Sequence, residues 1–287
     1  MLEYLNSNTL FNTIAMLRPE RRGSFIVVEG SDDQYVFRQH ADETVTILAG
    51  LGGKSDLLVA SSKVDEHAIS SVYFFVDRDY DNYLSTTIPY GRTVVASDGH
   101  DLVMDLVLSD QTIVRKVIES HARGQVAEGG AGIVASVIIE KALALAFSVG
   151  VLRLISVENN WGLNLRNYPF GKLSSDTPDD SELVQLALNW SAPSGLEGTI
   201  RSEHGRFVET YKDQKLSLVG DHDFFAAAAQ VMRGFGCKSV SGENLTASFL
   251  AAFSCNTFTR SEWFDTLASL SSTDSGATCF GCPCEAA

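Results

Sequence analysis

The acidic residues that could do chemistry in this chain follow two short apolar segments. Residues 25–28 are continuously apolar and lead into Glu29, and residues 72–76 lead into Asp77 and Asp79. Apolar runs of this length are typical of parallel strands buried on both faces. Ligand sites in open α/β sheets lie just beyond the carboxyl ends of such strands. We therefore predict that the three carboxylates share one crevice, where their oxygen atoms could bind Mg²⁺ or Mn²⁺.

A third acidic cluster follows another short apolar run and includes Asp101 and Asp105. These two residues are one helical turn apart and share a helix face, so both could reach the same crevice as further metal ligands. Asp101 is at least as well explained as the N-cap of the helix that begins there. His100 is a candidate proton carrier, although a single histidine in a turn more often has a structural role.

Two basic residues could contact a phosphate near these acids. Residues 50–55 imitate a phosphate-binding loop, but the Walker pattern requires a glycine where Leu48 stands. A glycine turn that opens a helix can still bind an anion through its N–H groups, and Lys54 could meet a nucleic-acid phosphate there. Arg78, between the paired aspartates, is the second candidate. A plain strand-to-helix turn explains residues 50–55 about equally well.

The elements that would position these residues alternate between strands and helices over the first half of the chain. Such alternation indicates βαβ units and a parallel sheet. We expect strands at residues 24–29, 45–49, 72–76 and 93–96, with helices at 1–17, 32–40, 54–66 and 101–122.

The second half of the chain has a different character. A glycine-rich link at 129–132 is followed mainly by helical patterns. We expect further strands only near 152–157 and 216–219. The fold class is thus α/β, with a mainly parallel, Rossmann-like sheet flanked by helices. The expected divisions are a catalytic domain at 1–123, an α-rich C-terminal domain at 124–270 and a flexible tail at 271–287.

The charge and cysteine content narrow the class of protein. The net charge of −14 argues against a general nucleic-acid coat protein, but a metal-dependent nuclease remains compatible with it. No signal peptide opens the chain, and charges interrupt the apolar stretch at 133–155, so we expect a cytoplasmic protein with no membrane contact.

Five cysteines lie in the last fifth of the chain. Zinc at Cys279, Cys282 and Cys284 is not expected, because a second ligand pair at the usual spacing is missing.

The order of these features resembles the toprim family. The resemblance covers roughly residues 20–110 and rests on a buried strand ending in Glu29-Gly30, then a helix and a strand, then a buried strand ending in Asp77-Arg78-Asp79. The motifs are most similar to the stand-alone toprim effector nucleases of bacterial anti-phage defence, a group that includes the nuclease subunit of the PARIS system. OLD-type toprim nucleases are more distant.

This resemblance implies a function and a set of roles. Glu29 would be the toprim glutamate, and Asp77 and Asp79 the metal-binding pair. Asp33 would be the second acid that OLD-type nucleases place one turn later. The implied activity is Mg²⁺-dependent cleavage of RNA, in particular tRNA, by a toxic effector released from an ABC-type ATPase partner, with a homodimer as a possible active form. Relatives carry a further glutamate near position 103, where this chain has Val103.

Two other functions remain open from the residues alone. The acids could bind Mg²⁺ or repel phosphate in a non-catalytic regulatory subunit of a defence complex. A DNA-nicking toprim enzyme is the other alternative, and it would need a nucleophilic tyrosine near the metal. The sequence contains several tyrosines near the acidic motifs, but none in a diagnostic context.

Overall fold

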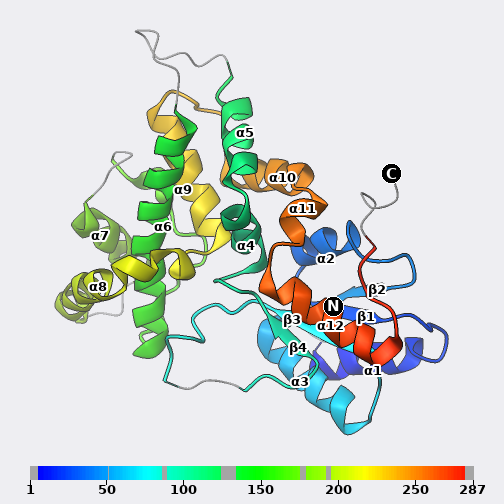
Figure 1. Cartoon of the computed structure of the whole chain (residues 1–287). Coiled ribbons are helices and arrows are strands. Elements are labelled where there is room, and N and C mark those ends of the chain that lie inside the picture. Colours follow the sequence, from blue (N-terminus) through cyan, green and yellow to red (C-terminus); the bar gives the residue numbers. More distant parts are fainter. Residues whose placement is uncertain are drawn as a thin grey trace. The chain divides into compact units, whose positions relative to one another are not determined.

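The computed structural model describes residues 6–50, 52–85, 89–123, 134–174, 179–191 and 195–281 (Figure 1). The chain divides into two compact units. The sheet unit comprises Met1–Arg78, Thr87–Ser109 and Ser254–Ala287, and the helical unit comprises Asp79–Thr86 and Asp110–Phe253. The predicted link at 129–132, and Cys282 and Cys284, fall outside the described residues.

The sheet unit is built on a four-stranded, all-parallel sheet in the order β2-β1-β3-β4 (Figure 1). Phe25 in β1 pairs with Thr46 in β2 on one side and with Val72 in β3 on the other. The prediction of an α/β fold with a parallel sheet flanked by helices is therefore confirmed. The strands are β1 Phe25–Val28, β2 Thr46–Ala49, β3 Val72–Val76 and β4 Val94–Ala96.

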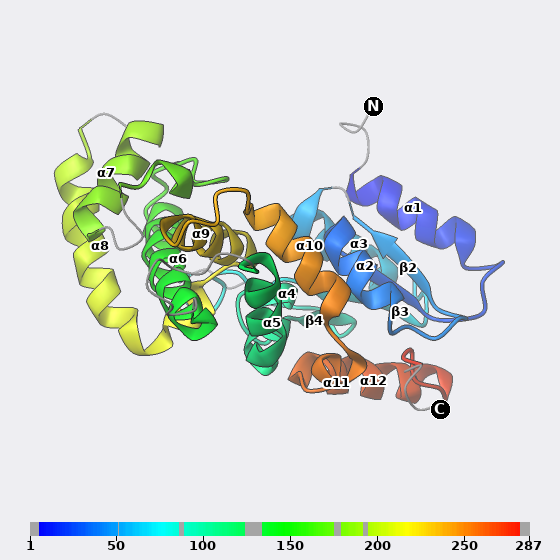
Figure 2. The same cartoon turned by 90° about the horizontal axis from the view of Figure 1, so that it is seen from above.

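Helices lie on both sides of the sheet (Figure 2), and its alternate side chains pack against different helices. On one face, Phe25 and Phe74 join a buried cluster with Ile14 of α1 and Leu57 of α3. On the other face, Phe75 packs at 5.1 Å from the ring of Trp263 in α12. Both faces of the sheet are thus covered, which explains the continuous apolar runs of its strands. The helices of this unit are α1 Ser7–Leu17, α2 Ser31–Arg38, α3 Gly53–Glu66, α4 Leu102–Ser109, α11 Cys255–Phe258 and α12 Glu262–Ser275.

The segment expected to be a flexible tail is instead attached to the sheet unit as far as residue 281. Helix α12 continues to Ser275. Beyond it, Asp42 N–H donates to the carbonyl of Cys279 (3.0 Å), and Gly281 N–H donates to the carbonyl of His40 (3.0 Å). Phe280 stacks on Phe264 with ring centroids 4.6 Å apart. Most residues of this segment are small and polar, which led to the prediction of a flexible tail. The buried side chains of Cys279 and Phe280 hold the segment in place.

The helical unit is organised around the long helix α6, which packs against α8 and α9. Two expected strands in this unit are wrong: residues 152–157 belong to α6, and most of 216–219 belongs to the short helix η3. In a helix that is apolar on all sides, the apolar residues show no helical spacing. The sequence of its last turns therefore cannot be distinguished from that of a buried strand. The elements are α5 Gln111–His121, α6 Ala135–Glu158, η2 Phe170–Lys172, α7 Asp180–Ser191, α8 Glu197–Tyr211, η3 Lys212–Leu218, α9 Asp221–Gly234 and α10 Gly242–Ala252.

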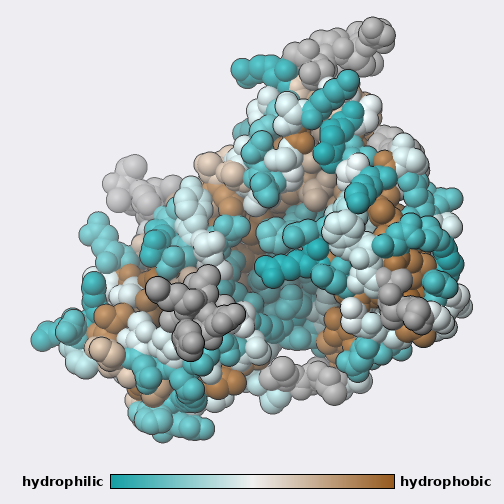
Figure 3. Space-filling model, turned by 180° about the vertical axis from the view of Figure 1, so that it is seen from behind, coloured by the Kyte–Doolittle hydropathy of each residue, from teal (hydrophilic) through white to brown (hydrophobic). Residues whose placement is uncertain are grey.

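Helix α6 also accounts for the long apolar stretch of the sequence. It is the one described helix that is long and apolar enough to cross a membrane, but 72% of its most apolar window is buried inside the protein. That burial is typical of the core helix of a soluble protein. Gly150 lets η3 approach closely, because a Cβ at this position would lie 2.0 Å from the carbonyl oxygen of Leu218. On the face shown in Figure 3, hydrophobic surface occurs as separate patches among hydrophilic side chains.

Candidate functional site

Glu29 and Asp77 come together at the carboxyl edge of the sheet. Each follows the last residue of its strand, and β1 and β3 are neighbours in the sheet. The backbone N–H of Asp77 donates to Oε1 of Glu29 at 2.9 Å. Because parallel strands end at the same edge, the two positions are adjacent despite the 48 residues between them. Both side chains are half-buried, so they are shielded from bulk water but still accessible.

The side chain of Asp77 also contacts the start of the helix that follows β4. Its Oδ1 accepts a hydrogen bond from the backbone N–H of Leu102, the first residue of α4, at 3.1 Å. The N-terminus of a helix carries partial positive charge, which favours an ionised carboxylate at this position. Asp77 is therefore held at the edge of the sheet by contacts of both its backbone and its side chain.

Asp105 holds the turn that precedes α4. Its two oxygens accept hydrogen bonds from Asp98 N–H and Gly99 N–H, both at 2.7 Å. The side chain is 8% exposed. Burial raises the pKa of this carboxyl from 3.8 to about 7; the two N–H donors act in the opposite direction, and the neighbouring Asp98 charge raises the pKa further. Asp105 is thus an anchor for the turn in the described structure.

The other acids predicted near the site cap helices. Asp101 Oδ1 accepts from Met104 N–H at 2.7 Å, which is the N-cap role considered for it from the sequence. Asp33 Oδ2 accepts from Gly30 N–H at 2.9 Å, so it ties the first turn of α2 to the residue after Glu29. His100, the candidate proton carrier, is buried in the turn before α4.

The two predicted phosphate-binding residues lie beside Asp77. Arg78 donates from its backbone N–H to Ser97 Oγ (2.8 Å) and from Nε to the Ser97 carbonyl (2.7 Å). Lys54 Nζ donates to the carbonyl of Arg78 at 3.0 Å. The guanidinium of Arg78 also lowers the pKa of Asp105, although burial outweighs this effect. Positive charge from α3 and from the end of β3 therefore gathers at the edge where Glu29 and Asp77 lie.

Asp79 belongs to a different part of the fold. It opens the segment Asp79–Thr86, which is grouped with the helical unit. Its backbone has φ 52°, a left-handed conformation that aspartate adopts more readily than most residues other than glycine. Hydrogen bonds within the sheet unit therefore join Asp77 to Glu29 and Lys54 to Arg78, whereas Asp79 lies in the segment that is grouped with the helical unit.

The donor chemistry at the sheet edge fits a hard divalent cation, but the ligand set is incomplete. Carboxylate oxygens are the ligands Mg²⁺ prefers, and Glu29 with Asp77 would supply the first two. Within the described ranges, no group of three His, Cys, Asp or Glu side chains lies close enough to hold a metal ion. Like Glu29 and Asp77, the predicted ligands Asp33, Asp101 and Asp105 accept backbone hydrogen bonds that a metal ion would have to replace or share.

The described cysteines do not form a cluster of three or more possible metal ligands with neighbouring acids or histidines. Cys237 and Cys279 are free and buried, and Cys255 is disulfide-bonded. Burial raises the pKa of the Cys279 thiol to about 11.

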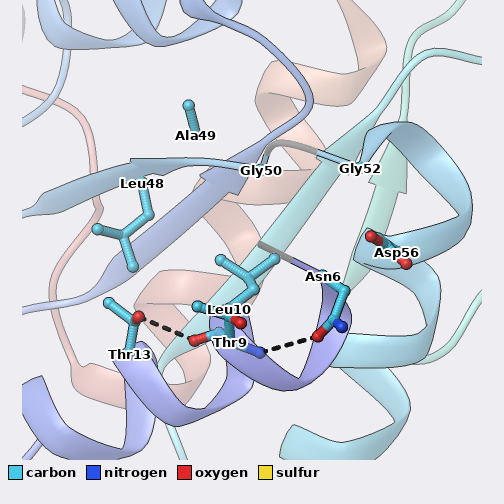
Figure 4. A pocket seen from close by; sticks show the side chains of 9 residues that line it. All are labelled: Asn6, Thr9, Leu10, Thr13, Leu48, Ala49, Gly50, Gly52 and Asp56. Carbon is cyan, nitrogen blue, oxygen red and sulfur yellow. Dashed lines mark hydrogen bonds between the residues drawn. The ribbon is translucent and has the colours of Figure 1, made fainter. Parts of the chain in front are cut away.

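A small cavity that the sequence did not indicate lies at the carboxyl end of β2 (Figure 4). Its volume is about 110 Å³, and α1, β2 and the start of α3 form its walls. A Cβ on Gly52 would lie 1.7 Å from Oδ2 of Asp56, so this carboxylate packs directly against the glycine turn. A negative charge there opposes the binding of a phosphate, and Lys54 extends toward Arg78 instead. The lining residues are Asn6, Thr9, Leu10, Thr13, Leu48, Ala49, Gly50, Gly52 and Asp56.

The helical unit contains a buried polar network that joins α6, α7 and α8. Ser148 Oγ donates to Asp180 Oδ1 at 3.0 Å and lies 3.0 Å from Nε2 of His204. Burial lowers the pKa of His204. The serine stands between the other two residues, whereas in a catalytic triad the histidine takes that place. This network therefore stabilises the packing of three helices and does not have the order of a catalytic triad.

The Gly-Asp-His-Asp segment at 220–223 begins helix α9. Asp223 is buried and pairs with Arg153, with Oδ2 at 2.8 Å from Nε. The side chain of His222 is 85% exposed. The segment therefore starts a helix and supplies a buried ion pair.

Comparisons of the sequence with protein-family models and with curated proteins find no match.

Proposed function

We propose that this chain is a toprim-type, divalent-metal-dependent phosphodiesterase that cleaves nucleic acid internally. The observation that carries the proposal is the contact between Glu29 Oε1 and the backbone N–H of Asp77 at the carboxyl edge of neighbouring parallel strands. The order of the Glu-Gly and Asp-x-Asp motifs supports it. Lys54 and Arg78 add the positive charge that a phosphodiester substrate requires.

Glu29 and Asp77 would hold the cation in this proposal, with Asp79 as the predicted third carboxylate. A bound Mg²⁺ or Mn²⁺ lowers the pKa of water and stabilises charge on a leaving oxygen. Glu29 has a second role available, because its half-buried carboxylate could accept a proton from the attacking water. Arg78 is restrained by two hydrogen bonds to Ser97, which would orient its guanidinium toward a phosphate without a large entropic cost.

The substrate and partner in this proposal follow from the motif resemblance. We propose RNA, in particular tRNA, as the substrate, an ABC-type ATPase as the partner that holds the enzyme until infection, and the cytoplasm as the location. The net charge of −14 supports a protein that does not bind nucleic acid indiscriminately, because its overall charge repels phosphate. Binding would then depend on the local basic residues and the metal.

The test uses a variant that keeps the fold and removes one charge. Glu29→Gln retains Oε1 as the acceptor for Asp77 N–H but cannot act as a carboxylate. We expect Mg²⁺-dependent cleavage of total tRNA, and toxicity in cells, to fall by at least about a hundredfold. Glu43→Gln, at an exposed acid before β2, is the matched control and should behave like the parent chain. Undiminished cleavage by Glu29→Gln would refute the proposed active site.

A non-catalytic regulatory subunit is the second candidate, and one observation favours it. No group of three possible metal-ligating side chains is found among the described residues, and five of the six predicted ligands accept hydrogen bonds from backbone N–H groups. Purified protein that binds Mn²⁺ but cleaves neither tRNA nor plasmid, alone or with an ATPase partner, would favour this function. Metal-dependent cleavage would exclude it.

A further inference from the structure

The cavity at the carboxyl end of β2 combines apolar walls with a polar rim (Figure 4). Leu10 of α1 and Leu48 of β2 line it, and both pack against the buried core of the sheet unit. Its volume is about 110 Å³. A protein cavity of about 150 Å³ encloses one benzene molecule, so this cavity has room for the edge of one flat ring. The walls therefore suit an aromatic ligand that enters by one edge.

Contacts between α1 and α3 fix the walls of the cavity. Lys63 Nζ in α3 donates a hydrogen bond to Oδ1 of Asn8 in α1. The ring of Phe11 in α1 lies 4.9 Å from that of His67, directly after α3. The cavity is thus formed before any ligand enters it, as small-molecule sites in proteins usually are.

Polar side chains at the rim have defined hydrogen-bonding roles. Asn6 Oδ1 accepts from Asn8 N–H (3.0 Å) and Thr9 N–H (3.3 Å) as the N-cap of α1, so its amide NH₂ is the group that can bind a ligand. Thr13 Oγ1 donates to the Thr9 carbonyl at 2.9 Å, which leaves it only the role of an acceptor toward a ligand. Asp56 contributes carboxylate oxygens, which accept. The rim therefore offers a donor from Asn6 beside an acidic acceptor.

The cavity lies one strand away from the carboxylate of Glu29. Gly50, which lines the cavity, donates from its backbone N–H to the carbonyl of Val28 at 2.7 Å, and Val28 directly precedes Glu29. Neighbouring strands are about 4.8 Å apart, so a phosphodiester held at Glu29 and Asp77 leaves the base of an adjacent nucleotide within reach of the cavity. All of these residues belong to the sheet unit.

We infer that the cavity binds the Watson–Crick edge of one base of the nucleic-acid substrate, a base that carries an amino group beside an accepting ring nitrogen. Cytosine and adenine have this edge. The amino group donates to the carboxylate of Asp56, and the amide of Asn6 donates to the ring nitrogen. Uracil and hypoxanthine have a carbonyl oxygen in place of the amino group, and that oxygen would face the carboxylate. The inference rests on the proposed function, because it makes the cavity the base-recognition subsite of the same enzyme.

The experiment measures nucleoside binding by NMR, from the methyl signals of Leu10 and Leu48, with EDTA present so that no metal contributes. Cytidine is compared with uridine, and adenosine with inosine, because the members of each pair differ at the amino group. We expect an amino-bearing nucleoside to bind at least about tenfold more tightly than its oxygen-bearing partner, as a bidentate base contact provides. The tighter of cytidine and adenosine identifies the base.

Two variants test the assigned contacts. Asp56→Asn exchanges the carboxylate for an amide that can also donate, so it should remove most of the preference for the amino-bearing nucleoside. Asn6→Asp keeps the N-cap acceptor and removes the donor, so it should weaken binding of the preferred nucleoside about tenfold. Glu66→Gln, at the exposed end of α3, is the matched control and should bind like the parent chain.

The outcomes separate this inference from the proposed function. If the parent chain binds no nucleoside, or binds both members of each pair equally, the inference is overturned, while tRNA cleavage and Glu29→Gln still test the proposed function. An unchanged preference in Asp56→Asn also overturns it, because an Asp56 with a purely structural role would not affect the choice of base. If the expected preference is found but no nucleic acid is cleaved, the cavity is a base-binding site and the proposed catalysis alone fails.

Discussion

The buried carboxyl of Asp105 should make the stability of the sheet unit depend on pH in an unusual direction. Its pKa is raised from 3.8 to about 7 because burial disfavours the charged form more than the N–H groups of Asp98 and Gly99 favour it. Between these two pH values, the folded chain keeps a proton that the unfolded chain has lost. The contribution of Asp105 to stability is therefore fully present below pH 3.8 and is lost as the pH rises to about 7.

The size of the effect follows from the same numbers. The difference between 3.8 and about 7 corresponds to about 4 kcal/mol of unfolding free energy, at 1.36 kcal/mol for each pH unit. Asp105→Asn removes the titration, since an amide stays neutral. The amide can still accept one of the two backbone N–H groups, so the variant should lose one hydrogen bond, at a cost of about 1 to 3 kcal/mol that does not vary with pH.

The assay compares the urea unfolding of the parent chain and Asp105→Asn at several pH values from 4 to 8, with EDTA present. We expect the stability of the parent relative to the variant to fall by several kcal/mol across this range. If the two stability curves run parallel, Asp105 ionises like an exposed aspartate, and the argument from burial is wrong. Repeating the series in Mg²⁺ tests Asp105 as a ligand, because a bound cation favours the ionised form and would flatten the difference.

Two stability predictions test other contacts. Asp98 accepts from Glu262 N–H (2.8 Å) and Trp263 N–H (3.0 Å), so Asp98→Ala should lower the unfolding free energy by about 1 to 2 kcal/mol as a lost helix cap, measured by urea unfolding. Asp265→Ala, at an exposed acid in the same first turn of α12, should cost less than about 0.5 kcal/mol, and an equal cost for both would contradict the capping role. Gly150→Ala should destabilise the protein by about 1 to 3 kcal/mol because its Cβ meets the Leu218 carbonyl. Gly205→Ala in α8, where a Cβ meets nothing within 4 Å, should be neutral or stabilising by up to about 1 kcal/mol, and thermal unfolding of the two variants decides this.

The sheet could be predicted from the sequence because its strands are buried on both faces. The runs at Phe25–Val28 and Val72–Val76 are apolar at every position, and the structure buries every residue in them. The same signal failed at residues 152–157, because α6 is also surrounded by protein and its apolar residues show no helical period. The prediction of a flexible C-terminal tail failed for the opposite reason. Its attachment depends on two buried residues, Cys279 and Phe280, within a polar stretch, and on backbone hydrogen bonds that any sequence could make.

The candidate site could be predicted only as far as strand order determines it. Glu29 and Asp77 meet because β1 and β3 are neighbours, and the positions of both residues after buried strands made that arrangement the simplest one. Asp105 accepts hydrogen bonds from a turn whose shape depends on tertiary packing. Asp98 accepts them from the start of α12, which is remote in sequence. No local pattern separates such anchoring acids from metal ligands. Asp77 and Asp79 illustrate the limit most clearly: one intervening residue suggests a single rigid pair, yet the two acids belong to different units of the fold. The spacing of a motif therefore identifies its chemistry, whereas the packing around each residue decides whether its members can act together.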